Sequence, residues 1–123
     1  EYQITGLASS QSFIAKHRAS AMKLMRAFVE GIHFYKTRKK ESMAIIAKYM
    51  RTNDTEAVAA TWDYFANKIV PKKPYPTAQG IKALLDLAAK ERPEAAKVPP
   101  ERIMDISLLK ELDDGGFIDR LYK

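Results

Sequence analysis

The stretch ASAMKLMRAFVEGIHFYK, residues 19–36, decides the fold of this 123-residue chain. Its apolar side chains recur every three or four residues, at Ala21, Met25, Phe28, Ile32 and Tyr35. That spacing places them on one face of an α-helix, and Met22, Leu24 and Val29 widen the face. So wide an apolar face predicts a deeply buried helix, with Gly31 as a point of close contact between helices.

Two more helices are predicted before residue 71, because all six prolines lie between Pro71 and Pro100. The first covers residues 40–50, and the second begins after Asn53 or Asp54, either of which can cap a first turn. The apolar face of the second is Val58, Trp62, Phe65, Ala66 and Ile69. With the helix at 19–36, this pattern predicts a core that buries most of Phe28, Ile32, Trp62 and Phe65.

Residues 71–76, PKKPYP, predict an extended connector, because a residue that precedes proline is driven out of the helical region. One interpretation is a stiff spacer between helices. The other is the edge of a ligand or partner groove built on Tyr75. Both stay open.

The C-terminal part is predicted to be helical as well. Thr77 can cap a fourth helix, whose inward residues are Ile81, Leu84, Leu85 and Ala88. After a loop, a short helix carries Leu108, Leu109 and Leu112 and ends at Gly115 and Gly116. A last apolar turn contains Phe117, Ile118 and Leu121.

The first residues have a different pattern. Residues 2–7, YQITGL, contain β-favouring types that predict one short strand within residues 1–9. A lone strand leaves its backbone donors and acceptors unpaired, so its neighbour must come from elsewhere. The chain is thus predicted to be mainly α, as a single helical bundle with one short N-terminal strand. Its segments are the strand (1–9), three helices (17–70), the connector (71–76) and the C-terminal helices (77–123).

Composition fits a soluble globular protein, with 46% hydrophobic and 29% charged residues. The formal net charge of +6 would suit a nucleic acid or a membrane surface. The basic residues, however, gather where helices are expected to end, at 36–40 and around Lys68 and Lys72, where cations interact favourably with the helix dipole. No nucleic-acid partner is therefore predicted. With no cysteine, the chain has no disulfide, thiol nucleophile or cysteine-bound zinc.

No catalytic, cofactor or metal site is predicted. Glu30 and His33 share a helix face, as in half of a carboxylate-bridged metal site, but no second such pair accompanies them. Ser9, Ser10 and Ser12 lack the glycine context of a nucleophilic serine. Hydroxyls at such a place are typical helix caps or turn formers.

Several stretches resemble, in order, the C-terminal third of a bacterial solute-binding protein. They are RAFVEGIHFYK (26–36), AKYM (47–50), KIVPKKPYPT (68–77), LLKELD (108–113) and GFIDRLY (116–122). The family is the nitrate/sulfonate/taurine type of ABC-transporter substrate-binding protein, related to the thiamine-precursor proteins. The resemblance spans nearly the whole chain but only part of a complete member, and none of the stretches is a catalytic signature.

In complete members of this family, two α/β lobes close on a ligand and the loaded protein docks on a membrane permease. The resemblance implies that residues 1–9 return from the second lobe and that the helices pack on the first. It implies a periplasmic or extracytoplasmic location, although no signal peptide is recognisable from Glu1 onward. It also implies a small anionic or organic solute, with Ser9, Ser10 and Thr5 as candidate residues near it.

The predicted function is therefore a noncatalytic segment of a solute-binding protein whose partners are an ABC permease and the solute. Two alternatives stay open: a freestanding helical interaction module without a ligand cleft, and an enzyme of the thiamine-precursor branch. An unpaired strand and uncovered apolar helix faces further predict that the isolated chain forms a homodimer.

Overall fold

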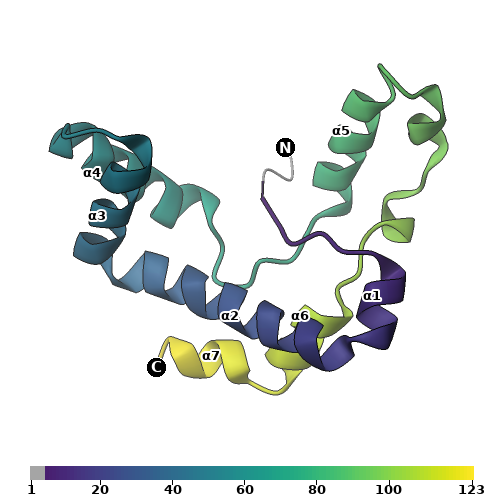
Figure 1. The fold of residues 1–123 in the computed structure, drawn as a ribbon, viewed down its shortest axis with the longest axis horizontal. Coiled ribbons are helices and arrows are strands. Elements are labelled where there is room, and N and C mark those ends of the chain that lie inside the picture. The colour runs from purple at the N-terminus through teal and green to yellow at the C-terminus, as the bar shows by residue number, and fades with distance from the viewer. Residues whose placement is uncertain (1–4) are drawn as a thin grey trace.

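The computed structural model describes residues 5–123, and this part of the chain is mainly helical (Figure 1). Its α-helices are α1 (Gln11–Lys16), α2 (Arg18–Thr37), α3 (Lys39–Met50), α4 (Thr55–Tyr64), α5 (Ala78–Ala88), α6 (Ser107–Asp114) and α7 (Phe117–Leu121). A π-helical turn, η1 (Phe65–Ile69), continues α4, and two 3-10 turns, η2 (Pro93–Lys97) and η3 (Pro100–Arg102), follow α5. The predicted mainly α fold is confirmed.

The N-terminal strand is not formed by the described residues, because 5–10 contain no strand. A strand needs a neighbour to pair its backbone groups, and residues 5–123 supply none. The rest of the predicted strand, residues 1–4, lies outside the described part. Ser10 instead caps the short helix α1, which the sequence pattern did not predict, and its Oγ accepts a hydrogen bond from the Phe13 amide at 3.1 Å.

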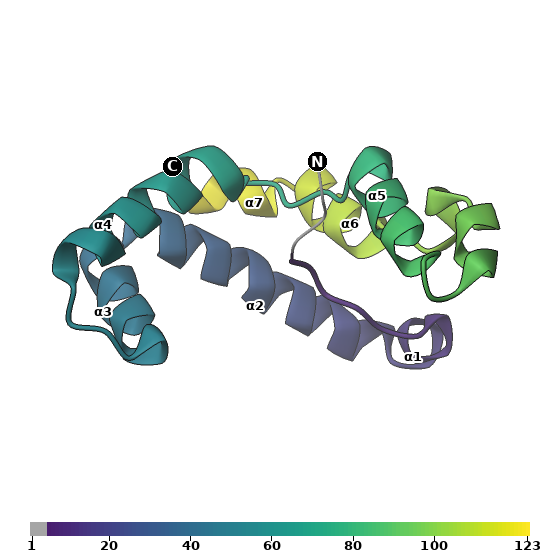
Figure 2. The same ribbon diagram turned by 90° about the horizontal axis from the view of Figure 1, so that it is seen from above.

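Helix α2 is the spine of the molecule, and Figure 2 shows α6 and α7 alongside it. The main core forms where Val29 of α2 meets Leu109 and Leu112 of α6 and Ile118 of α7. The predicted apolar face of α6 is confirmed, because Leu108, Leu109 and Leu112 are all buried. Between α6 and α7 the backbone turns at Gly116, whose φ of 68° is a conformation that glycine adopts without strain.

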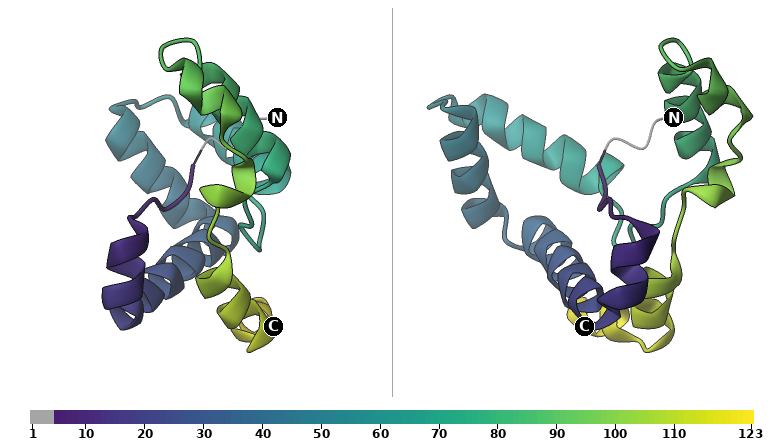
Figure 3. Two further views of the ribbon diagram at one scale, coloured as in Figure 1. Left: turned by 90° about the vertical axis from the view of Figure 1, so that its right-hand side faces the viewer. Right: turned by 45° about the vertical axis from the view of Figure 1, so that its right-hand side comes forward.

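Two arms extend from this spine and stand apart from each other (Figures 1 and 3). The α4 arm, residues 38–70, contains α3, α4 and η1. The α5 arm, residues 78–102, contains α5, η2 and η3. The connector, residues 71–76, leads from the first arm to the second, and residues 103–106 lead from the second arm back to α6.

The predicted core is confirmed in part. Trp62 and Ile32 are buried, and Phe28 is half-buried. Phe65 is 39% exposed, so its predicted burial is wrong. The buried residues of this segment are Val58, Trp62 and Ala66, at a spacing of four, and Phe65 lies beside that stripe. Ala66 stays buried, whereas Ile69 joins Phe65 on the exposed side.

Candidate functional site

A groove of about 1050 Å³ lies between α2 and the two arms. Its floor is formed by Met25, Phe28 and Ile32 of α2. Phe65 and Ile69 of η1 line one side, and Ile81 of α5 lines the other. Tyr75 of the connector also lines the groove, as the groove-edge interpretation of the Pro-rich connector anticipates. The structure thus gathers residues from both arms and the connector around one surface.

This groove is mostly apolar, and residues 5–123 leave it open. Large apolar side chains in its lining are exposed, namely Leu7, Phe65, Ile69, Ile103 and Ile106. Lys73 and Asp105 are the charged residues of the described lining. At Gly31, also in the lining, an added Cβ would meet no atom within 4 Å, so the close helix contact predicted there is not made among the described residues. Such a surface is suited to packing against another apolar surface.

One wall of the groove is fixed by hydrogen bonds between the ends of α2 and α4. The Tyr35 carbonyl lies in the last turn of α2, where helical carbonyls lack intrahelical partners. It accepts hydrogen bonds from the Trp62 indole Nε1 at 2.8 Å and from Ser42 Oγ at 3.2 Å. Trp62 is buried, as predicted, and its indole N–H also caps the C-terminal end of α2.

A second contact has its donor on α2 and its acceptors at the end of the α4 arm, and the donor is Lys36. Its ammonium donates hydrogen bonds to the Val70 carbonyl, at 2.6 Å, and to the Ala66 carbonyl, at the C-terminal end of η1. Burial, together with the nearby charge of Lys72, lowers the pKa of Lys36. Lys39 adds an ion pair to Asp63 at 2.7 Å and lies over the Trp62 ring. The α4 arm is thus held to α2 by contacts made in both directions.

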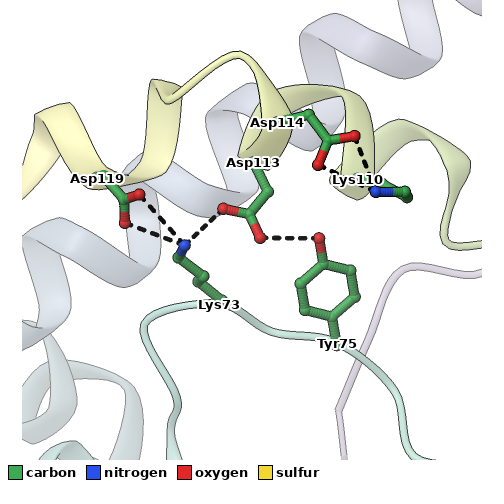
Figure 4. Close-up of polar contacts among 6 residues, drawn as sticks. All are labelled: Lys73, Tyr75, Lys110, Asp113, Asp114 and Asp119. Carbon is green, nitrogen blue, oxygen red and sulfur yellow. Dashed lines mark hydrogen bonds and ion pairs between the residues drawn. The ribbon is translucent and has the colours of Figure 1, made fainter.

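A different cluster holds the connector to the C-terminal helices (Figure 4). The Lys73 ammonium pairs with Asp113 Oδ1 at 2.6 Å and with Asp119 Oδ1 at 3.1 Å. The Tyr75 hydroxyl donates to the other Asp113 oxygen, Oδ2, at 2.9 Å. We call Lys73, Tyr75 and Asp113 the latch. Asp114, the next residue, points to Lys110 of its own helix instead.

The contacts within the latch favour the charged forms of Lys73 and Asp113 and the neutral form of Tyr75. The hydrogen bond from Lys73 is the main cause that lowers the pKa of Asp113. The same bond, followed by that to Asp119, raises the pKa of Lys73. Burial, then the hydrogen bond to Asp113, raises the pKa of the Tyr75 phenol. The Asp113 side chain is only 18% exposed, so these bonds are partly shielded from water.

The three candidate ligand residues do not come together at one point. Thr5 lines the groove. Ser10 is used as the cap of α1, and its Oγ lies 3.0 Å from Ser12 Oγ. Ser9 is exposed on the segment that leads into α1. Sequence reasoning missed the latch, since its acidic member is separated from Lys73 and Tyr75 by about forty residues, although all three lie within the quoted stretches 68–77 and 108–113.

The histidines occupy ordinary structural positions. His33 packs edge-on against the Tyr122 ring, with ring centroids 4.9 Å apart, and Glu30 is exposed on α2. His17 packs against Phe13 at the junction of α1 and α2. Among residues 5–123 no group of three or more histidine and acidic side chains is placed to hold a metal ion.

Comparison of the chain with models of protein families, with curated proteins and with solved structures finds no match. No helix in the described part combines the length and the apolar character needed to cross a membrane.

Proposed function

We propose that this chain is a noncatalytic segment of a solute-binding protein that serves an ABC importer, and that its groove packs on an α/β lobe of the same protein. The solute would be a small anion or polar organic molecule, and the loaded protein would dock on a membrane permease outside the cytoplasm. The quoted stretches provide the family resemblance. The exposed groove supports the packing role.

The observation that carries this proposal is the amount of surface left exposed. The chain exposes 9039 Å². A compact monomer of this size exposes about 6,700 Å². The excess, about 2,400 Å², is as large as one side of a permanent interface, which buries roughly 2,000–5,000 Å² over both partners. A segment that completes a larger body would have such an excess.

The groove lining has the chemistry of such an interface. Its exposed large apolar members are isoleucine, leucine and phenylalanine, and its charged members in the described lining are Lys73 and Asp105. Permanent interfaces resemble a domain core cut in two, with charged residues depleted at the centre. Gly31 on the groove floor leaves room for another backbone to come close.

The test is to determine the complete open reading frame and to produce the protein that it encodes. Hydrogen exchange should show that groove residues of α2 are protected more strongly in that longer chain than in residues 1–123 alone. Calorimetry with taurine, a longer alkanesulfonate and nitrate should show binding by the longer chain only, since a cleft needs both lobes. A longer chain whose groove amides remain unprotected would refute the proposal.

A second function is favoured by the same exposed groove: a freestanding interaction module in which another copy covers the surface. The excess area is large enough for an obligate symmetric dimer. Light scattering on the 123-residue chain separates a dimer from a monomer. If the complete open reading frame adds no α/β lobe and the chain is a stable dimer, this alternative replaces the first. The enzyme alternative gains no support from the geometry of His33 or Ser10.

A further inference from the structure

The two walls of the groove are attached to the spine in different ways. In the α4 arm, η1 lies against α2, and α3 contacts both α2 and α4. The α5 arm has no such support: among the described helical elements, α5, η2 and η3 have Cα atoms within 8 Å only of one another. The buried residues of α5 are Gly80 and Leu85. The α5 arm therefore makes no contact with a described helix outside itself.

The attachment of the α5 arm depends on the segments that enter and leave it. The latch acts on the entering segment. Lys73 and Tyr75 flank Pro74, and the Tyr75 amide donates a hydrogen bond to the Lys73 carbonyl at 2.9 Å, which closes a tight turn between them. The side chains of both residues reach Asp113. Pro74 and Pro76 restrict the backbone around them, and Thr77 caps α5 immediately afterwards. Holding residues 73–75 consequently holds the root of the arm.

We propose that Asp113 is a positioning residue for the groove: through Lys73 and Tyr75 it fixes the α5 arm, and release of this latch lets the arm swing as a rigid body and widen the groove. The rest of the molecule stays in place, because α2, α6 and α7 share the main core and the α4 arm has its own contacts with the spine. The significance of the arm movement for solute capture rests on the proposed function, whereas the movement itself is argued from the contacts of the latch alone.

Asp114 provides a matched control for Asp113. The two residues are adjacent and carry the same side chain, but Asp114 pairs with Lys110 within α6, at 2.8 Å. Asp113→Asn removes the nearer of the two carboxylate charges that pair with Lys73 and leaves Asp119 in place, whereas Asp114→Asn removes a local pair and leaves the connector bonds intact. Tyr75→Phe removes only the hydroxyl donor and retains the ring that packs on the core.

The experiment measures the distance between the two arms by pulsed electron resonance. The chain contains no cysteine, so Ala60→Cys on α4 and Ala88→Cys on α5, both at exposed positions, accept spin labels at these two sites alone. Labelled chain is diluted into an excess of unlabelled chain, so that only distances within one molecule contribute. Circular dichroism confirms that each variant is folded.

In the parent chain a single distance should dominate, with a second position populated to about 10% or less. In Asp113→Asn the longer distance should become the major population, and Asp114→Asn should resemble the parent. If Asp113→Asn does not fold, Tyr75→Phe and the parent in 1 M salt, where the screening length falls to about 3 Å, must show the longer distance. An unchanged distribution in Asp113→Asn, or equal broadening in Asp114→Asn, overturns the proposal. A moving arm in a protein whose complete chain binds no solute would refute the proposed function alone.

Discussion

The two arms of this molecule, residues 38–70 and 78–102, are attached to the spine in contrasting ways. The α4 arm exchanges side chain to backbone hydrogen bonds with the spine in both directions, from Trp62 to the Tyr35 carbonyl and from Lys36 to the Val70 carbonyl. No described helix outside the α5 arm contacts it, and its entering segment is tied to α6 and α7 by the latch and by the ion pair from Lys73 to Asp119. Backbone carbonyls at helix ends are present in any such fold, so the difference lies in which side chains reach them.

This contrast indicates how stability is distributed in the molecule. Local opening requires little free energy where few apolar contacts and few shielded hydrogen bonds must be broken. The α5 arm meets this description, and the α4 arm does not. The exposed groove therefore has one fixed wall and one adjustable wall, which would let it adapt to the surface that covers it.

The largest expected effect comes from truncating the anchor of the α4 arm. Trp62 is 7% exposed and caps α2, so Trp62→Ala should lower the free energy of unfolding by about 3–5 kcal/mol. Tyr64→Ala, on the same helix but 56% exposed, is the control and should cost about 0.5 kcal/mol or less. Urea melts followed by circular dichroism measure both. Equal losses in the two variants would show that the α4 arm is not anchored by Trp62.

A smaller effect is expected at the opposite side of the same contact. Lys36→Met keeps the length of the side chain and removes both bonds to carbonyls at the end of η1, which should cost about 1–3 kcal/mol. Exchange of the Val70 amide, which donates to the Phe65 carbonyl, should accelerate. Lys40→Met changes an exposed lysine that has no hydrogen bond or ion pair within residues 5–123, and it should leave both quantities unchanged. If Lys36→Met is as stable as Lys40→Met, the hydrogen bonds from Lys36 do not hold the α4 arm to α2.

The corresponding truncation in the α5 arm should act locally. Leu85 is buried in that arm, so Leu85→Ala should accelerate amide exchange throughout α5. Because the arm opens without the spine, the global free energy of unfolding should fall by only about 1 kcal/mol or less, below the usual cost of such a truncation. Leu87→Ala, 52% exposed on the same helix, is the control. A full loss of 2–5 kcal/mol in Leu85→Ala, with exchange changed in α2 as well, would show that the arms unfold together.

The helices were predictable from the sequence because their apolar side chains recur at helical spacing and their caps are local. Asp54 and Thr77 cap α4 and α5 through amides three residues later in the chain. The exposure of Phe65 was not predictable, because Phe65 and Ala66 both follow Trp62 at helical spacing and only tertiary packing selects which of the two is buried. The latch was not predictable either, since it joins residues that only the tertiary fold brings together. The sequence indicated one part of the groove, its edge at Tyr75, through the second interpretation of the Pro-rich connector.

The smallest expected effect is the response of the latch to pH. The pKa of Asp113 lies below its ordinary value of 3.8, so its stabilising contribution is present above that value and is lost as pH falls through the folded pKa. The pKa of Lys73 lies above 10.5, so its contribution is complete below that value and is lost as pH rises through the folded pKa.

The latch should therefore stay closed between about pH 4 and pH 10 and open at either extreme. The other charged groups that face the latch are Asp119, Lys110 and Asp114. Carboxyl carbon resonances should place the pKa of Asp113 below 3.8 in the parent and closer to that value in Lys73→Met. A pKa of Asp113 that is the same with and without Lys73 would mean that the connector does not hold this carboxylate, and the α5 arm would then need another anchor.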